Sequence, residues 1–110
     1  MELVFYNCEP QDAAKITNKI LEKGLAANVS VIPGVQRRYY QQDDIQQKAQ
    51  TMLLIYTRKH LLNPLFYLLG ESSSDQPPAI MALGMSSGYK PSVDWLTETV
   101  PKDAAQAAVH

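Results

Sequence analysis

The side chains best suited to binding a transition metal are few in this sequence. The only thiol is Cys8, and the only imidazoles are His60 and His110. Zinc and copper sites need several nitrogen or sulfur ligands that converge on one point. A lone cysteine is more typical of a small buried apolar residue, and isolated histidines are more typical of solvated surface. Cys8 and His60 are nevertheless the candidate metal ligands to test.

A second group of candidates surrounds a predicted turn at Asp43–Asp44, where basic and aromatic residues alternate with glutamines. Antiparallel pairing around that turn brings Lys48 close to Tyr39. Such a group fits a cleft between subunits that accepts a small anion, and it equally fits a solvated strand edge whose charges discourage aggregation. The candidate cleft residues are Arg37, Arg38, Tyr39, Tyr40 and Lys48.

Motifs for covalent or phosphoryl chemistry are absent from the sequence. It contains no glycine-rich phosphate loop, no nucleophile elbow and no metalloprotease motif. The serines at 72–74 have no evident base partner, and the acidic residues form no recognisable catalytic pair. The sequence therefore predicts a protein that is not an enzyme and that carries no cofactor.

The composition of the chain limits the kinds of partner that the protein can bind. The chain has 110 residues, of which 45% are hydrophobic, and ten basic and eleven acidic side chains give a net charge of −1. This composition predicts one globular domain at 1–100, followed by a flexible tail at 101–110. The charge provides no basic surface for nucleic acid, and no apolar run is long enough to span a bilayer. Since the first residues also lack the features of a signal peptide, a cytoplasmic location is expected.

The elements that must position these side chains follow from hydrophobic periodicity. Extended runs are predicted at 3–8, 27–42, 45–57 and 79–85. Helices are predicted from Asp12, a candidate cap, to Gly24, at 60–69, and from Pro91 onward. This order predicts an α+β, ferredoxin-like βαββαβ sandwich with a long central β-hairpin and a C-terminal helix.

Two of the predicted strands are apolar on both faces. Residues 3–8 and 52–56 contain almost no polar positions. A ferredoxin-like sheet carries its helices on one face, so a monomer would alternate apolar and polar residues along each strand. Another copy of the chain is the simplest cover for the second face.

The segment Glu22–Pro33, which reads EKGLAANVSVIP, resembles the EKxLAACxxxIP block of the CutA family of divalent-cation tolerance proteins. The resemblance continues through the hairpin to Thr57, and resumes at Ile80–Leu83 and at Gly88 with Trp95. It implies a tight homotrimer related in architecture to the PII signalling proteins, with the hairpin reaching a neighbouring subunit. It also implies a role in divalent-cation tolerance or signalling, with a metal or small molecule as a possible ligand. The alternative is a PII-like sensor that binds a small anionic effector or nucleotide in clefts between subunits.

The positions that differ from the family pattern are mostly the reactive or charged ones. Asn28 stands where the family has cysteine, Tyr56 stands where it has lysine, and Ser73–Ser74–Asp75 replaces its His-Pro-Tyr motif. These differences predict no stoichiometric high-affinity metal site. A three-fold axis could still gather three copies of Cys8 or His60, which is why both are to be tested.

Overall fold

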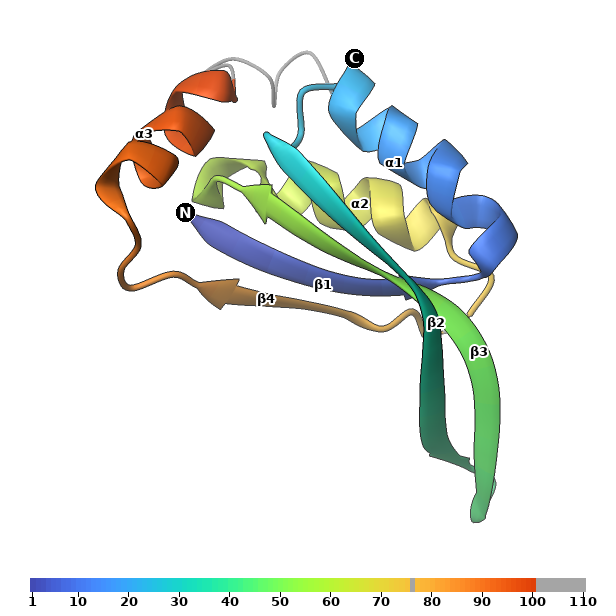
Figure 1. Ribbon diagram of the computed structural model, residues 1–110. Coiled ribbons are helices and arrows are strands. Elements are labelled where there is room, and N and C mark those ends of the chain that lie inside the picture. The colour runs from blue at the N-terminus through green and yellow to red at the C-terminus, as the bar shows by residue number, and fades with distance from the viewer. Residues whose placement is uncertain (76, 101–110) are drawn as a thin grey trace.

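The computed structural model describes residues 1–75 and 77–100, which form one antiparallel sheet with helices packed on it (Figure 1). The predicted tail at 101–110, with His110, lies outside the described residues. No helix in the described part is long and apolar enough to cross a membrane. The elements in chain order are β1 (Glu2–Cys8), α1 (Ala13–Glu22), β2 (Asn28–Gln41), β3 (Asp44–Thr57), α2 (Leu62–Ser72), β4 (Ile80–Gly84) and α3 (Lys90–Thr99).

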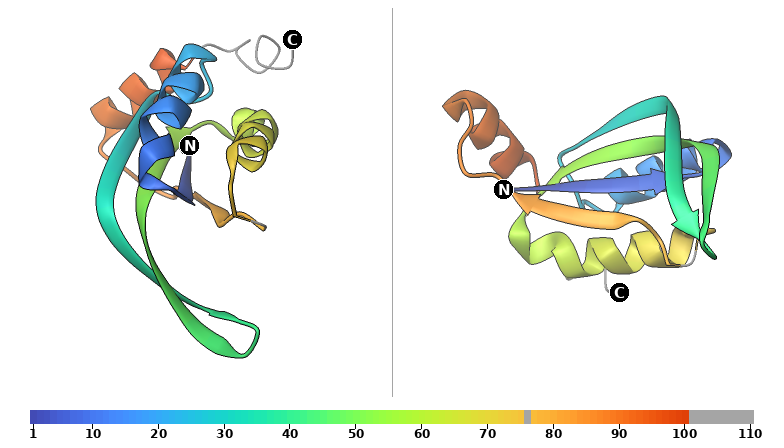
Figure 2. Two further views of the ribbon diagram at one scale, coloured as in Figure 1. Left: turned by 90° about the vertical axis from the view of Figure 1, so that its right-hand side faces the viewer. Right: turned by 90° about the horizontal axis from the view of Figure 1, so that it is seen from below.

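The sheet has the strand order β2-β3-β1-β4, with all neighbouring strands antiparallel. Helices α1 and α2 cover one face, and α3 stands at the end of the sheet near the N-terminus (Figures 1 and 2). This arrangement confirms the predicted ferredoxin-like fold with a long central hairpin and a C-terminal helix. The structure differs from the prediction at the second helix, which begins after a 3₁₀ turn at Lys59–Leu61.

Helix α1 shows how local sequence sets an element's ends. Ile16 and Ile20 lie one turn apart and are both buried against the sheet. The helix ends in a Schellman motif, because Gly24 adopts a φ of 66° and the Leu25 amide donates to the Ile20 carbonyl at 3.0 Å. Asp12 occupies the N-cap position of this helix, as predicted, but it makes no side-chain capping hydrogen bond and also ends a 3₁₀ turn.

The core lies between the sheet and helices α1 and α2. Alternate residues of the two central strands point into it, and the sheet register places them side by side, with Val4 opposite Ile55 and Tyr6 opposite Leu53. The fully buried side chains that complete this layer are Ile20, Leu25, Leu61, Leu65 and Leu69.

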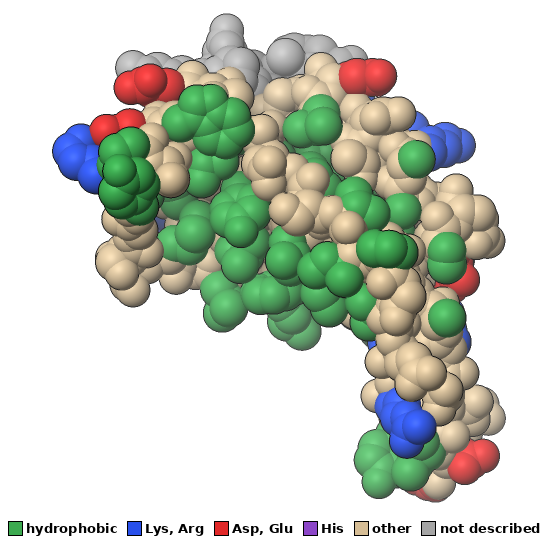
Figure 3. Space-filling view, in the orientation of Figure 1, with side chains coloured by type: hydrophobic (Ala, Val, Ile, Leu, Met, Phe, Trp, Pro, Cys, Tyr) green, Lys and Arg blue, Asp and Glu red, His purple; other side chains and the backbone are tan. Residues whose placement is uncertain are grey.

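The other face of the sheet, here called the open face, is also apolar. Its residues are the alternate positions of the same strands, where Phe5 pairs with Leu54 and Leu3 with Tyr56. Figure 3 shows the hydrophobic side chains gathered over these strands. On edge strand β4, Met81 is 70% exposed and Leu83 is 58% exposed. The predicted two-sided apolar strands are therefore present, and within the described residues α3 covers only one end of the open face (Figure 1).

Strands β2 and β3 continue beyond the sheet as a long twisted hairpin (Figures 1 and 2). A bulge between Ile32 and Val35, at Pro33–Gly34, marks the change of direction. The turn lies at Gln42–Asp43, where both residues have positive φ, which is typical of a type I′ turn. The predicted turn at Asp43–Asp44 was wrong by one residue, because Asp44 already pairs with Gln41 in the ladder.

Candidate functional site

The turn position decides which hairpin side chains face one another. Arg37 lies directly across from Lys48, Tyr39 across from Gln46, and Val35 across from Gln50. This face turns toward the body of the molecule. Lys48 was predicted to lie close to Tyr39, and the ladder places it across from Arg37, two residues along the same face of β2.

The opposite face of the hairpin is solvated. Arg38 and Tyr40 alternate with Arg37 and Tyr39 along β2, and both are exposed. Of the five predicted cleft residues, Arg37, Tyr39 and Tyr40 border a cavity of about 420 Å³, together with Gln41, Asp75 and Pro77. The structure thus brings only part of the predicted group together, and it adds residues that the sequence analysis did not select.

The most important of these is Asp75, which lies in the loop between α2 and β4. One of its carboxylate oxygens, Oδ1, accepts a hydrogen bond from Lys48 Nζ at 2.7 Å. The other, Oδ2, lies 3.2 Å from Arg37 Nη1 and accepts a bond from Gln50 Nε2 at 3.0 Å. A single carboxylate therefore bridges two strands of the hairpin to a loop that is distant in sequence.

Glu9 and Gln50 complete what we call the ionic cluster, formed by Glu9, Arg37, Lys48, Gln50 and Asp75. Glu9 Oε1 lies 2.9 Å from Lys48 Nζ. Gln50 is fully buried, and its Oε1 accepts a bond from Arg37 Nη1 at 3.4 Å. The guanidinium of Arg37 also stacks 4.5 Å from the centre of the Tyr39 ring.

The charges in this cluster balance. Like charges directly opposite each other in a sheet are destabilising, so the pairing of Arg37 with Lys48 requires nearby anions. The hydrogen bonds to Asp75 and Glu9 raise the pKa of Lys48, and the bond from Lys48 holds the pKa of Asp75 below its usual range. Both cationic groups of the cluster are paired with carboxylates, which leaves little uncompensated positive charge for an external anion.

The loop that carries Asp75 is itself fixed to the sheet. The Tyr6 hydroxyl, from β1, and Ser73 Oγ lie 2.7 Å apart, and Ser73 Oγ also donates to the Leu69 carbonyl at 2.8 Å. Burial raises the pKa of Tyr6, so this phenol remains protonated. The positions that replace the family's His-Pro-Tyr motif therefore form a polar junction between α2, β1 and the hairpin.

The candidate metal ligands lie apart. Cys8 is at the end of β1 and pairs with Thr51, whereas His60 follows Thr57, which pairs with Glu2 at the start of β1. Seven residues of strand separate those two ends by about 20 Å. Burial also raises the pKa of Cys8 to about 11, so the thiol is protonated at neutral pH. Among residues 1–75 and 77–100, no three His, Cys, Asp or Glu side chains form a group that could hold a metal ion.

We expect tag-free protein to show no zinc or copper site tighter than about 1 µM by titration calorimetry. The reason is that one chain supplies only one thiol, which is protonated, and two imidazoles, while tight sites need several converging ligands. A tight site per chain or per three chains, lost in Cys8→Ser or His60→Ala, would contradict this expectation.

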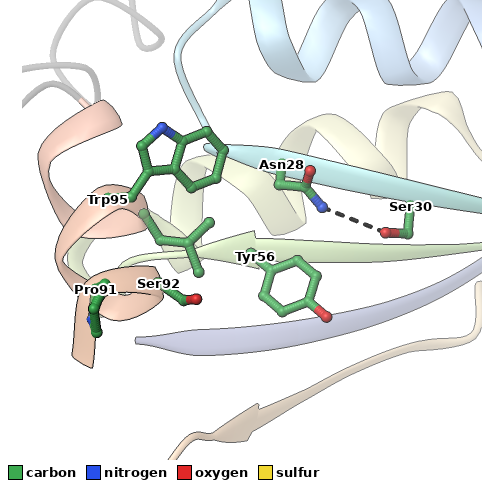
Figure 4. A pocket seen from close by; sticks show the side chains of 7 residues that line it. Asn28, Ser30, Tyr56, Pro91, Ser92 and Trp95 are labelled. Atoms are coloured by element: carbon green, nitrogen blue, oxygen red, sulfur yellow. Dashed lines mark hydrogen bonds between the residues drawn. The ribbon is translucent and has the colours of Figure 1, made fainter. Parts of the chain in front are cut away.

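A separate pocket of about 480 Å³ lies between α3 and the open face (Figure 4). Trp95 and Leu96 line it from the helix, and Tyr56 lines it from β3. On the β2 side of the pocket, Asn28 Nδ2 donates a hydrogen bond to Ser30 Oγ at 3.3 Å. The lining contains no charged side chain, so it offers an apolar surface with amide and hydroxyl groups. Asn28, Tyr56 and Trp95 each stand out in the sequence, but no sequence pattern indicates that they share a pocket.

The fold and these sites define the class of protein. It is a ferredoxin-like α+β protein with helices on one sheet face, an apolar second face and a projecting β-hairpin on which Arg37 and Lys48 are paired with carboxylates. The chain belongs to the CutA1 family, described as divalent ion tolerance proteins, whose sequence model matches residues 2–99.

Individual relatives agree with this assignment. The chloroplastic protein CutA of Arabidopsis thaliana is 30% identical over 96 residues, which cover 86% of this chain and 53% of that protein. The divalent-cation tolerance protein CutA of Thermus thermophilus is 28% identical and is covered to 95% of its length, with 88% of this chain matched. This chain therefore spans about half of the plant relative and nearly all of the bacterial one.

Solved structures show the same fold. The divalent cation tolerance protein (Cut A1) of Thermus thermophilus superposes with a TM-score of 0.85 at 27% identity, covering 92% of this chain and all of that one. CutA1 of Oryza sativa superposes with a TM-score of 0.86 at 24% identity, covering 92% of this chain and 94% of that one.

Proposed function

We propose that this protein is a non-enzymatic binding scaffold that assembles as a homotrimer and acts in divalent-cation tolerance or signalling. The observation that carries the proposal is the apolar open face of the sheet. The family assignment supplies the functional context, because its members are described as divalent ion tolerance proteins. The proposal assigns no catalytic residue to the chain.

The open face supports self-association on energetic grounds. Leu3, Phe5 and Leu54 lie side by side at its centre, and Met81 and Leu83 extend it to the edge strand. Monomeric soluble proteins rarely expose a continuous apolar surface of this kind. Each apolar side chain that becomes fully buried contributes about 1.5–3 kcal/mol, so several in contact exceed the cost of association. Closed symmetric assembly covers the face without leaving a copy of it exposed.

The hairpin supports the same proposal. It carries an exposed apolar pair at its tip, where Tyr40 lies across from Ile45. These side chains are 79% and 63% exposed, respectively. A long ribbon with an apolar end gains stability when that end packs on another copy, as the resemblance to the CutA family implies.

The ionic cluster supports the proposed scaffold over the alternative of an anion sensor. A sensor for a nucleotide or another small anion needs cations that are available to its ligand. Arg37 and Lys48 are instead bound to Asp75 and Glu9 at distances of 2.7–3.2 Å. The geometry therefore favours a scaffold whose open pocket, beside α3, is uncharged.

We expect light scattering coupled to size exclusion to give three times the mass of one chain at low micromolar concentration. An obligate oligomer buries its apolar face at all concentrations at which it is folded. A folded, soluble monomer would contradict the proposal, and a stable dimer would retain self-association while excluding the trimer.

A further inference from the structure

We infer that Arg37, Lys48 and Gln50 form an anion cradle that Asp75 fills as an internal carboxylate ligand, and that this contact holds the hairpin against the body of the subunit. The inference concerns contacts within one subunit and is independent of how many copies assemble. It assigns Asp75 a role as a positioning residue.

The cradle has the donors that a carboxylate requires. Lys48 Nζ and Arg37 Nη1 bind different oxygens of Asp75, and the Gln50 amide binds one of them as well. Charge-assisted hydrogen bonds to both oxygens of one carboxylate are typical of anion recognition. In this protein the anion is part of the chain.

The cradle is also better shielded than an ordinary surface ion pair. The side chains of Arg37, Lys48 and Asp75 are 24%, 30% and 21% exposed. The surface pair Lys90–Asp94, which lies one turn apart on α3, has side chains that are 84% and 49% exposed. Since water screens charges less at the cradle, its contacts contribute more to the geometry of the molecule. Lys90–Asp94 therefore provides a matched control with the same residue types.

This one carboxylate connects β2 and β3 to the loop between α2 and β4. Arg37 belongs to β2, and Lys48 and Gln50 belong to β3. Asp75 lies just beyond Ser73, which is anchored to Tyr6 of β1. Without the carboxylate, two cations would face each other across the hairpin with only Glu9 nearby, so repulsion would loosen this part of the ribbon.

The test is chemical rescue of Asp75→Ala, which removes the carboxylate and leaves room for a small one. We expect faster hydrogen exchange in peptides spanning residues 35–50 and a melting temperature lowered by about 5 °C. Sodium formate or acetate should restore both in a saturable manner, and sodium chloride of equal ionic strength should not. The unsubstituted protein should show no such difference between the salts, because Asp75 already occupies the cradle.

The control is Asp94→Ala, for which we expect little change and no difference between the two salts. Exchange in Asp75→Ala that equals that of the unsubstituted protein would overturn the inference. So would acetate acting no differently from chloride on this variant.

A second pair of variants tests the inference if Asp75→Ala does not fold. Asp75→Asn keeps the side-chain size but leaves the cations of the cradle poorly paired. Adding Lys48→Gln to it should recover part of the lost melting temperature, because one of the opposed cations is removed. If the double variant is instead less stable than Asp75→Asn alone, the carboxylate is not compensating the cations and the inference fails.

Discussion

Replacing Leu54 by aspartate is expected to abolish self-association. Leu54 lies at the middle of the open face, beside Phe5 on β1 and Ser30 on β2. The variant no longer buries the leucine side chain, which removes about 2 kcal/mol of association free energy in each copy. It also places a carboxylate where the assembly would exclude water, at a cost of several kcal/mol unless the group is protonated. The expected loss in each subunit is large enough to dissociate a trimer at micromolar concentration.

Light scattering of Leu54→Asp should give the mass of one chain or an unfolded species. Met81→Asp separates these outcomes, since Met81 is 70% exposed in the subunit and its replacement leaves the core intact. A folded monomer is expected for Met81→Asp, by circular dichroism and light scattering together. Leu21→Asp is the matched control, because Leu21 is 44% exposed on the outer side of α1, away from the open face. A trimeric Met81→Asp would show that the face is not the assembly surface.

Much of the fold could be predicted because its determinants are local. The helix predicted between Asp12 and Gly24 is present, with Ile16 and Ile20 buried on its inner face, and Gly24 ends α1 as its position suggested. The apolar runs of β1 and β3 likewise predicted strands with two apolar faces, which the sheet register bears out. Such patterns depend on residues a few positions apart, so they can be read directly from the sequence.

The register of the hairpin could not be predicted as well. Both Gln42–Asp43 and Asp43–Asp44 are acceptable turn sequences, and shifting the turn by one residue changes every cross-strand partner by two. The sequence therefore placed Lys48 close to Tyr39 without identifying its partner, while the ladder places it directly opposite Arg37. This difference matters, because the correct register creates a pair of opposed cations.

The ionic cluster itself depends on contacts between distant parts of the chain. Asp75 is separated in sequence from Arg37 and Lys48 by all of helix α2, and Glu9 directly follows the end of β1. No spacing rule connects such residues. The sequence did provide one signal, since Asp75 falls where the resembled family has another motif. The same reasoning applies to the α3 pocket, whose residues come from β2, β3 and α3.

The hairpin tip is expected to strengthen assembly without supporting the subunit fold. Tyr40→Ser combined with Ile45→Thr removes the exposed apolar pair and keeps the turn and the ladder intact. If these side chains pack on a neighbouring copy, their loss costs about 1–3 kcal/mol per contact, which raises the dissociation constant by roughly ten- to a hundredfold. The change should appear as dissociation at higher protein concentration in sedimentation velocity, with an unchanged circular dichroism spectrum.

Tyr67→Ser is the matched control, because Tyr67 is 72% exposed on α2, on the helical side of the molecule. It removes a comparable exposed aromatic side chain from a surface that the proposed assembly does not use. Dissociation in the tip variant together with a stable Tyr67→Ser oligomer would place the tip in the interface. Equal stability of both variants would mean that the hairpin contributes nothing beyond its own subunit. In that case the open face alone must hold the copies together, and Leu54→Asp and Met81→Asp would account for the whole assembly energy.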